Sequence, residues 1–207
     1  IIYDHNSPGG NVDGMDFAAM AIAGTKKKTI ARVHYWSQSA SYTLASQADE
    51  IQAVSPTVFV GSVGILVSYY DWSKWYKEIG VEEVTITSES APDKSPDKSR
   101  LKELLQQNIN KTEKIMLERV STGRIKAGNK KVTVDFIKQN FGKGWDLIAH
   151  DALGVSMIDK IEGIEETNIN SNSNVRENDM DLSNVTLEQL KSGNPELYKK
   201  IFSSGAE

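Results

Sequence analysis

The sequence predicts an α/β fold, because strand-like and helix-like segments alternate from its first residue. A short apolar run at 1–3 enters a turn with paired glycines at 6–12, and a helical pattern of small and apolar residues follows at 11–23. A second apolar run at 30–36 breaks into small residues at 37–46, which is typical of a strand, a sharp turn and a helix. Strand, helix and strand in this order make a βαβ unit, whose two strands should lie parallel in one sheet.

The two turns of this unit carry the residues that suggest chemistry. In a parallel sheet the Gly9-Gly10 turn and the Ser39 turn should meet at the carboxyl edge, where α/β proteins usually place their sites. Ser39 would stand at a helix N-terminus, where free backbone N–H groups gather. One turn can supply a nucleophile and the other can supply amides that bind an oxyanion. The alternative is that the small residues at 37–46 let a buried helix pack closely.

The composition and net charge exclude several classes of site and give no support for several classes of partner. The chain has 207 residues and 39% hydrophobic content, enough for one sizeable domain and an appendage. Its net charge of −4 gives no reason to expect nucleic-acid or anionic-membrane partners. With no cysteine, disulfides, thiolate metal sites and a cysteine nucleophile are excluded, and neither a metal nor a cofactor is predicted. Neither a membrane span nor a signal peptide is visible in the sequence.

The remaining elements follow from local patterns. We expect short strands at 51–54, 57–60, 65–67 and 84–86, and helices at 71–79, 99–120, 134–141 and 145–153, with a last strand after Gly154. An aromatic stripe on the 71–79 helix is formed by Trp72, Trp75, Tyr76 and Ile79. It predicts a core or subunit contact, and a ligand-binding surface is the alternative. Residues 165–179 hold five asparagines and are predicted as a linker, and 180–207 contains two short amphipathic helix candidates.

Four motifs in order carry a resemblance to a known family. They are Ser7-Pro8-Gly9-Gly10, the segment from Ser39 to Ser46, Ala48-Asp49-Glu50-Ile51 and Gly61-Ser62-Val63-Gly64. Together they resemble the signal peptide peptidase A family of serine peptidases, in the Clp protease and crotonase superfamily, over residues 1–164. The resemblance implies repeated ββα units, a mostly parallel sheet flanked by helices, and further elements upstream of Ile1. It makes 1–164 the Ser/Lys peptidase domain.

A serine nucleophile needs a neighbouring base, and the histidines are poorly placed in sequence to be that base. They are His5, His34 and His150, and none falls between Ser39 and His150, so the Ser-His-Asp order of the Clp peptidases is not reproduced. The resemblance instead implies a lysine in the proline-rich loop at 87–98. Lys94 matches that position best, and Lys98 is the alternative.

The resemblance also implies the remaining site residues. The backbone N–H groups of Gly10 and Ala40 would form the oxyanion hole, and Ser62 would orient the lysine, although Ser62 can also be an ordinary turn serine. A lysine amine works as a base near neutral pH only if burial and neighbours lower its pKa by about 3 units from roughly 10.4. The base must therefore be enclosed in the assembled site.

The function implied is a serine endopeptidase acting on polypeptides. The proline- and serine-rich loop and the 180–207 segment resemble phage prohead proteases, which form homo-oligomeric rings and process capsid scaffold and head proteins in the prohead, within the host cytoplasm. One alternative is a soluble bacterial peptidase that degrades signal-peptide remnants. Another is a crotonase-like enzyme acting on a coenzyme A thioester, and a third is an inactive scaffold component. A serine-directed fluorophosphonate distinguishes these, because only the peptidases need a nucleophilic Ser39.

Overall fold

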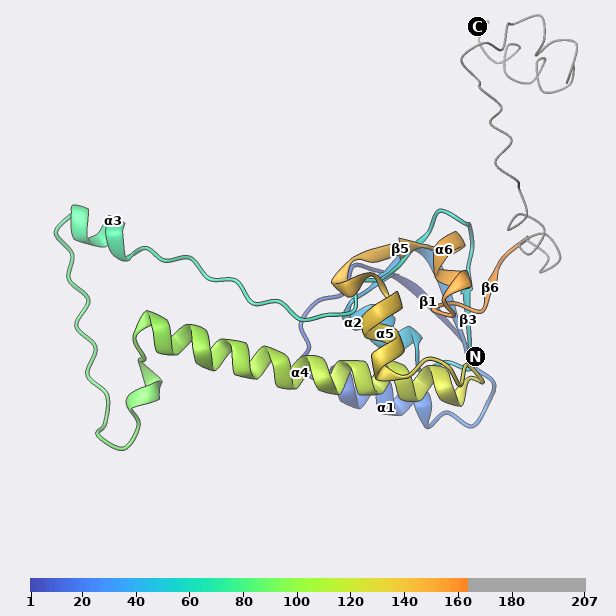
Figure 1. The fold of residues 1–207 in the computed structure, drawn as a ribbon, viewed down its shortest axis with the longest axis horizontal. Helices are drawn as coiled ribbons and strands as arrows, with labels where there is room; N and C mark the ends of the chain where they lie inside the picture. The colour runs from blue at the N-terminus through green and yellow to red at the C-terminus, as the bar shows by residue number, and fades with distance from the viewer. Residues whose placement is uncertain (164–207) are drawn as a thin grey trace, which may run out of the picture. The chain divides into compact units, whose positions relative to one another are not determined.

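The computed structural model describes residues 1–163, which form a curled sheet with helices packed against it (Figure 1). The chain divides into two units, Ile1–Ile164 and Glu165–Glu207. The predicted linker at 165–179 and the predicted helical segment at 180–207 lie outside the described residues.

Strand β2 is the centre of the six-stranded sheet of this part of the chain. The strands are β1 (Ile2–Ser7), β2 (Ile30–Gln38), β3 (Glu50–Ala53), β4 (Phe59–Gly61), β5 (Asp146–Ile148) and β6 (Lys160–Ile161). Strand β2 pairs in parallel with β1, with β3 along its first half and with β4 along its end, and only the β4–β5 pair is antiparallel. Because β3 and β4 share β2 in succession, the sheet curls. The predicted α/β fold with a mostly parallel sheet, of the Clp protease and crotonase type, is confirmed.

Helices α1 (Met15–Ala23), α2 (Ala40–Ala45) and the C-terminal part of α4 (Lys98–Lys126) pack against one another. Gly123, inside α4, allows this contact, because a Cβ there would lie 2.2 Å from the carbonyl oxygen of Ser46. Met116, Leu117 and Val120 of α4 are buried in the same core as Tyr42 of α2. The helix that begins at the Ser39 turn is therefore held from both sides. Helices α5 (Val134–Asn140) and α6 (Ala149–Gly154) complete this part of the chain.

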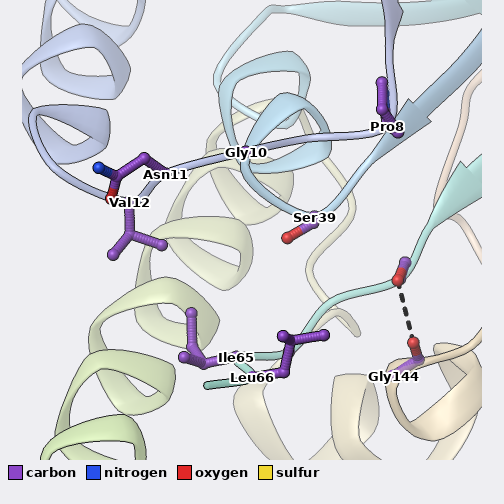
Figure 2. Close-up of a pocket in the computed structure, with 10 residues that line it drawn as sticks. Pro8, Gly10, Asn11, Val12, Ser39, Ile65, Leu66 and Gly144 are labelled. Carbon is purple, nitrogen blue, oxygen red and sulfur yellow. Dashed lines mark hydrogen bonds between the residues drawn. The ribbon is translucent and has the colours of Figure 1, made fainter. Parts of the chain in front are cut away.

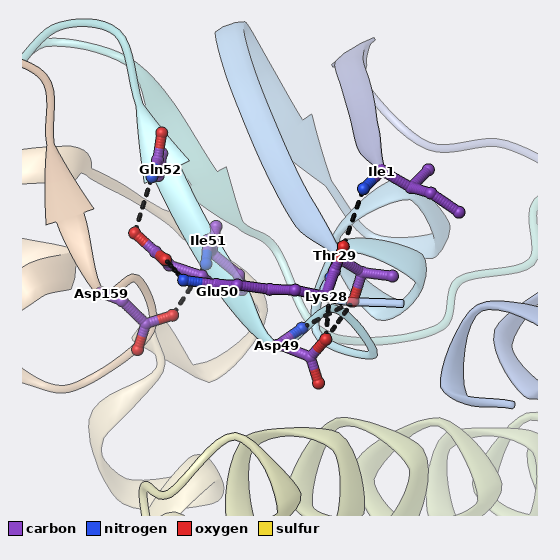
Figure 3. Close-up of polar contacts among 8 residues, drawn as sticks. All are labelled: Ile1, Lys28, Thr29, Asp49, Glu50, Ile51, Gln52 and Asp159. Carbon is purple, nitrogen blue, oxygen red and sulfur yellow. Dashed lines mark hydrogen bonds and ion pairs between the residues drawn. The ribbon is translucent and has the colours of Figure 1, made fainter. Parts of the chain in front are cut away.

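Polar contacts fasten the far end of the sheet. Arg124 of α4 is fully buried and donates to the Asp159 carboxylate at 2.5 Å, which in turn accepts the Ile51 N–H at 2.7 Å. Figure 3 shows the contact between Ile51 and Asp159 beside the hydrogen bonds from the Thr29 N–H and hydroxyl to the Asp49 carboxylate, which measure 2.8 and 2.9 Å. These bonds hold the pKa of Asp49 below its ordinary value. Strands β2 and β3 are thus tied together where both begin.

Residues 64–115, which we call the arm, leave the sheet after β4 and return along α4 (Figure 1). The arm carries α3 (Ser73–Glu78), the short 3-10 helix η1 (Pro92–Lys94) and the first part of α4, and none of its side chains is buried. From Lys98 to Met116, the first buried residue of α4, the helix rises about 27 Å. The tip of the arm is therefore far from the sheet.

Three predicted elements are wrong or incomplete. Residues 65–67 and 84–86 form no strand, because no neighbouring segment of the described chain pairs with them, and Ile86 is 92% exposed. The predicted helix at 145–153 begins instead as β5, since residues 146–148 pair with β4. Helix α3 confirms the helix predicted at 71–79, but Trp72, Trp75 and Tyr76 are not core residues. They stack on one another and stay partly exposed, so the core interpretation of the stripe is wrong.

Candidate active site

Ser39 lies at the sharp turn between β2 and α2 in an unusual backbone conformation. Its φ of 52° and ψ of −122° are uncommon for a residue with a side chain, and such strain tends to occur at functional sites. Its N–H donates to the Gly61 carbonyl at 2.7 Å, which fixes the turn to the end of β4. The Ser39 hydroxyl bonds to no other group of residues 1–163 and points into a cavity (Figure 2).

The Gly9-Gly10 turn lies directly against the Ser39 turn. A Cβ on Gly9 would come within 2.7 Å of the Ser39 Cβ and 2.9 Å of the Gln38 carbonyl oxygen, and Gly9 has a φ of +102°. Both the close approach and the backbone angle therefore require glycine at this position. As expected from the parallel strands, the two turns share one edge of the sheet.

The cavity in front of Ser39 has a volume of about 520 Å³. Its walls combine apolar side chains with backbone and hydroxyl groups, and they include Gly10, Val12, Ser62, Ile65, Leu66 and Gly144 (Figure 2). Ala40 follows Ser39 as the first residue of α2. In residues 1–163 the N–H groups of Gly10 and Ala40 donate to no other group of the chain, so both are available to a ligand. The structure thus brings Ser39, Gly10, Ala40 and Ser62 together.

Ser62 follows β4 and also has a positive φ, 47°. Its hydroxyl donates to the Gly144 carbonyl at 3.0 Å (Figure 2). The neighbouring loop is held by a hydrogen bond from the Gln38 side chain to Asp146. In the single chain, Ser62 is therefore fixed at the rim of the cavity by a backbone carbonyl and not by a lysine.

Neither candidate lysine reaches this cavity within one chain. Lys94 ends η1 at the tip of the arm and is exposed, and Lys98 is the first residue of α4. The Lys98 amine donates to Asp71 at 2.6 Å, a hydrogen bond that holds the pKa of Asp71 well below its ordinary value. The structure therefore does not bring a lysine of the arm to Ser39 of the same copy.

His5 is a feature that the sequence did not indicate as part of the site. Its Nδ1 lies 3.1 Å from the hydroxyl of Ser41, which lies 3.2 Å from the hydroxyl of Ser37, and all three side chains are buried. Burial lowers the pKa of His5 below its ordinary value. The contact joins residues 36 positions apart, and only the β1–β2 pairing together with the start of α2 brings them together.

The other histidines lie elsewhere. His34 pairs with Asp4 at 2.9 Å and His150 with Asp151 at 3.0 Å, and neither borders the Ser39 cavity. Within residues 1–163, no group of three or more His, Asp or Glu side chains is placed to hold a metal ion. In the same part of the chain, none of the helices combines the length and the hydrophobicity that crossing a membrane requires.

The curled parallel sheet, with a strained serine turn beside a glycine turn, defines a protein of the Clp protease and crotonase class. The chain matches the model of the peptidase family S49 over residues 21–175, more than half of its 207 residues, and it belongs to this family. The resemblance to signal peptide peptidase A, the type to which this family corresponds, is thereby confirmed. Among curated proteins, none matches the chain. Family membership indicates a peptidase, a hydrolase of peptide bonds.

Proposed function

We propose that this protein is a serine endopeptidase in which Ser39 is the nucleophile. The observation that carries the proposal is the strained Ser39 turn, which faces a cavity bordered by the free N–H group of Gly10 and begins helix α2 at Ala40. The Ser39 Oγ would attack the peptide carbonyl, and the N–H groups of Gly10 and Ala40 would bind the oxyanion. Losing one such donor typically costs roughly 3 to 4 kcal/mol in the transition state.

Lys94 of a second copy of the chain would act as the base. A serine hydroxyl needs a group to accept its proton, and in residues 1–163 no lysine or histidine borders the Ser39 cavity. Lys94 lies at the tip of an arm whose aromatic side chains, among them Trp72 and Trp75, are about half exposed in the described part of the chain. Arms packed against neighbouring copies would cover these side chains and carry Lys94 to the next Ser39. Enclosure there would favour a neutral amine, as a lysine base requires.

The reaction then follows in two halves. The neutral amine of Lys94 takes the Ser39 proton as Oγ bonds to the carbonyl carbon, and the resulting ammonium gives that proton to the leaving amine as the peptide bond breaks. The amine next takes a proton from water as the water oxygen bonds to the acyl carbon, and the ammonium returns that proton to Ser39 Oγ as the ester bond breaks, which restores the serine and the neutral amine. Ser62, at the cavity rim, would hold the incoming lysine amine. Lys98 is the alternative base, although Asp71 holds its amine.

The biological role proposed is maturation of a phage capsid, with scaffold and head proteins as substrates inside the prohead. The proline- and serine-rich loop at 87–98 and the amphipathic pattern at 180–207 support it. A ring of copies would bury the aromatic side chains of the arm, which are partly exposed in the described residues of one copy. A soluble peptidase that removes signal-peptide remnants is the alternative within the same chemistry.

The direct test is labelling with a fluorophosphonate, located by mass spectrometry, together with hydrolysis of casein. We expect the label on Ser39, and we expect Ser39→Ala and Lys94→Ala each to abolish hydrolysis while the protein remains folded. Lys98→Ala and Ser55→Ala, a control on a partly exposed serine that does not border the Ser39 cavity, should remain active. An unlabelled Ser39 in a protein that hydrolyses coenzyme A thioesters would overturn the proposal in favour of crotonase-like chemistry. An unlabelled and inactive protein would point to a scaffold component.

A further inference from the structure

A second cavity, of about 600 Å³, adjoins the first around the glycine turn. Gly10 and Asn11 border both cavities. The walls of the second include His5, Gly9, Gly10, Ala40, Ser41 and Leu44. Gly10 and Ala40, whose N–H groups would bind the oxyanion, therefore both border this second cavity.

The imidazole ring of His5 lines this cavity, and only one of its two nitrogens has a hydrogen-bond partner in residues 1–163. The side chain is only 9% exposed, and its Nδ1 is occupied by the Ser41 hydroxyl at 3.1 Å. The other ring nitrogen, Nε2, bonds to no group of residues 1–163. This nitrogen opens onto the cavity without a partner in residues 1–163, so a ligand group that bonds to it gains affinity over one that cannot.

The surroundings of His5 limit the kind of ligand group. A hydroxyl can donate or accept, so Ser41 is compatible with either tautomer of the ring, and Nε2 can therefore accept or donate. Because burial lowers the pKa of His5, the ring is neutral near pH 7. Asp4 and Asp13 also border the cavity, and their negative charges oppose a carboxylate ligand. An amide or hydroxyl side chain can bond to Nε2 in either tautomer, whereas an ammonium group can only donate and so fits one tautomer alone.

We propose that the second cavity receives the side chain of the substrate residue whose carbonyl is attacked, and that His5 selects an uncharged hydrogen-bonding side chain such as glutamine or asparagine. This inference rests on the proposed peptidase function. A carbonyl oxygen held by the N–H groups of Gly10 and Ala40 places the adjoining side chain beside residues that border this cavity. His5 and Ser41 would therefore set specificity without entering the bond-breaking steps.

The test measures cleavage by the assembled wild-type protein. Cleavage sites in casein are mapped by mass spectrometry, and peptides built on the fastest site then vary only the residue before the cleaved bond among Gln, Asn, Met, Leu, Glu and Lys. We expect kcat/KM for Gln to exceed that for Met, a side chain of similar length, by about 10- to 100-fold. Equal values for Gln and Met would overturn the inference and leave the peptidase function intact.

The double variant His5→Leu/Ser41→Ala removes both partners of the His5–Ser41 hydrogen bond at once, and of the groups in this cluster it leaves only the buried Ser37 hydroxyl without its contact. We expect its Gln-to-Met ratio to fall to about 1 or below, with the Met peptide still cleaved. His34→Leu, on a histidine outside the cavity, should keep the wild-type ratio. A double variant that keeps the Gln preference would also contradict the role of His5. If the double variant does not fold, the wild-type peptide series still decides. Absence of both cleavage and fluorophosphonate labelling would instead count against the proposed function.

Discussion

Gly9 and Ser39 meet where the two turns of the site touch. The Gly9 Cα lies so close to the Ser39 turn that an added methyl group would overlap the Ser39 Cβ and the Gln38 carbonyl. The position of the proposed nucleophile relative to the Gly10 N–H thus depends on the absence of a side chain at Gly9.

Gly9→Ala should therefore inactivate the protein more than it destabilises it. The substitution adds strain at a φ of +102°, which costs about 1 to 3 kcal/mol of folding free energy, and it also pushes the two turns apart. A displacement of about 1 Å in a catalytic group can cost about 100-fold in rate, so casein hydrolysis should fall by at least about that factor. Urea unfolding gives the stability and casein hydrolysis gives the activity.

Gly128→Ala is the matched control for this prediction. Gly128 has a φ of +104°, nearly the same as Gly9, but a Cβ there would meet no atom within 4 Å. It should show a similar loss of stability with wild-type activity. If Gly9→Ala were as active as Gly128→Ala, the close contact would not matter to catalysis.

At the residue scale, local signals in the sequence locate the turns of the site, while the catalytic roles of the residues in these turns stay predictions. Glycines and small residues in the sequence indicate the turns of the site. These turns hold Ser39, Gly10, Ala40 and Ser62, which border two adjoining cavities in the structure. The pair of His5 and Ser41 could not be predicted, because a hydrogen bond across 36 residues exists only once the strands are paired. The base assignment likewise stays a prediction, since Lys94 meets no Ser39 within one chain.

Among the elements, errors occur where the partner of a segment is not local. The β1–α1–β2 unit was predicted from its alternating pattern and its glycine turn. The segments at 65–67 and 84–86 have apolar residues suited to strands, but a strand needs a neighbour, and in the described chain none is beside them. The helix predicted at 145–153 is wrong where β5 lies, because the β4–β5 pairing joins residues more than 80 positions apart.

The arm is the element that should respond to association. Trp75 stacks at 6.2 Å from Trp72 and 5.4 Å from Tyr76 between ring centroids, yet it remains 51% exposed. Trp75→Ser should change folding stability by about 0.5 kcal/mol or less, because the site is outside the core. It should reduce the assembled mass measured by light scattering, and casein hydrolysis should fall with it.

Tyr35→Ser is the control for the arm. Tyr35 is 71% exposed but lies on β2, in the body of the sheet, so its loss should leave both mass and activity unchanged. A Trp75→Ser protein with wild-type mass and activity would show that the aromatic stripe is not the contact between copies.

At the scale of the whole molecule, the main observation is that Lys94 and Ser39 lie far apart within one copy. The arm carries Lys94 beyond a helical segment of about 27 Å that has no buried residue, whereas Ser39 stands at the edge of the sheet. Within residues 1–163, a single copy holds the turn of the proposed nucleophile and the proposed oxyanion amides, but no lysine borders the cavity beside them. The central claim is therefore that a complete site needs Ser39 from one copy and Lys94 from another.

Mixing two inactive variants tests this claim most directly. Ser39→Ala retains Lys94, and Lys94→Ala retains Ser39, so sites formed between the two variants would contain both groups. After joint refolding of equal amounts, we predict casein hydrolysis of about one quarter of the wild-type rate, as random pairing across a head-to-tail interface requires. The double variant Ser39→Ala/Lys94→Ala mixed with Lys94→Ala should stay inactive. No recovery in the first mixture, under conditions where refolded wild-type protein is active, would contradict a site shared between copies.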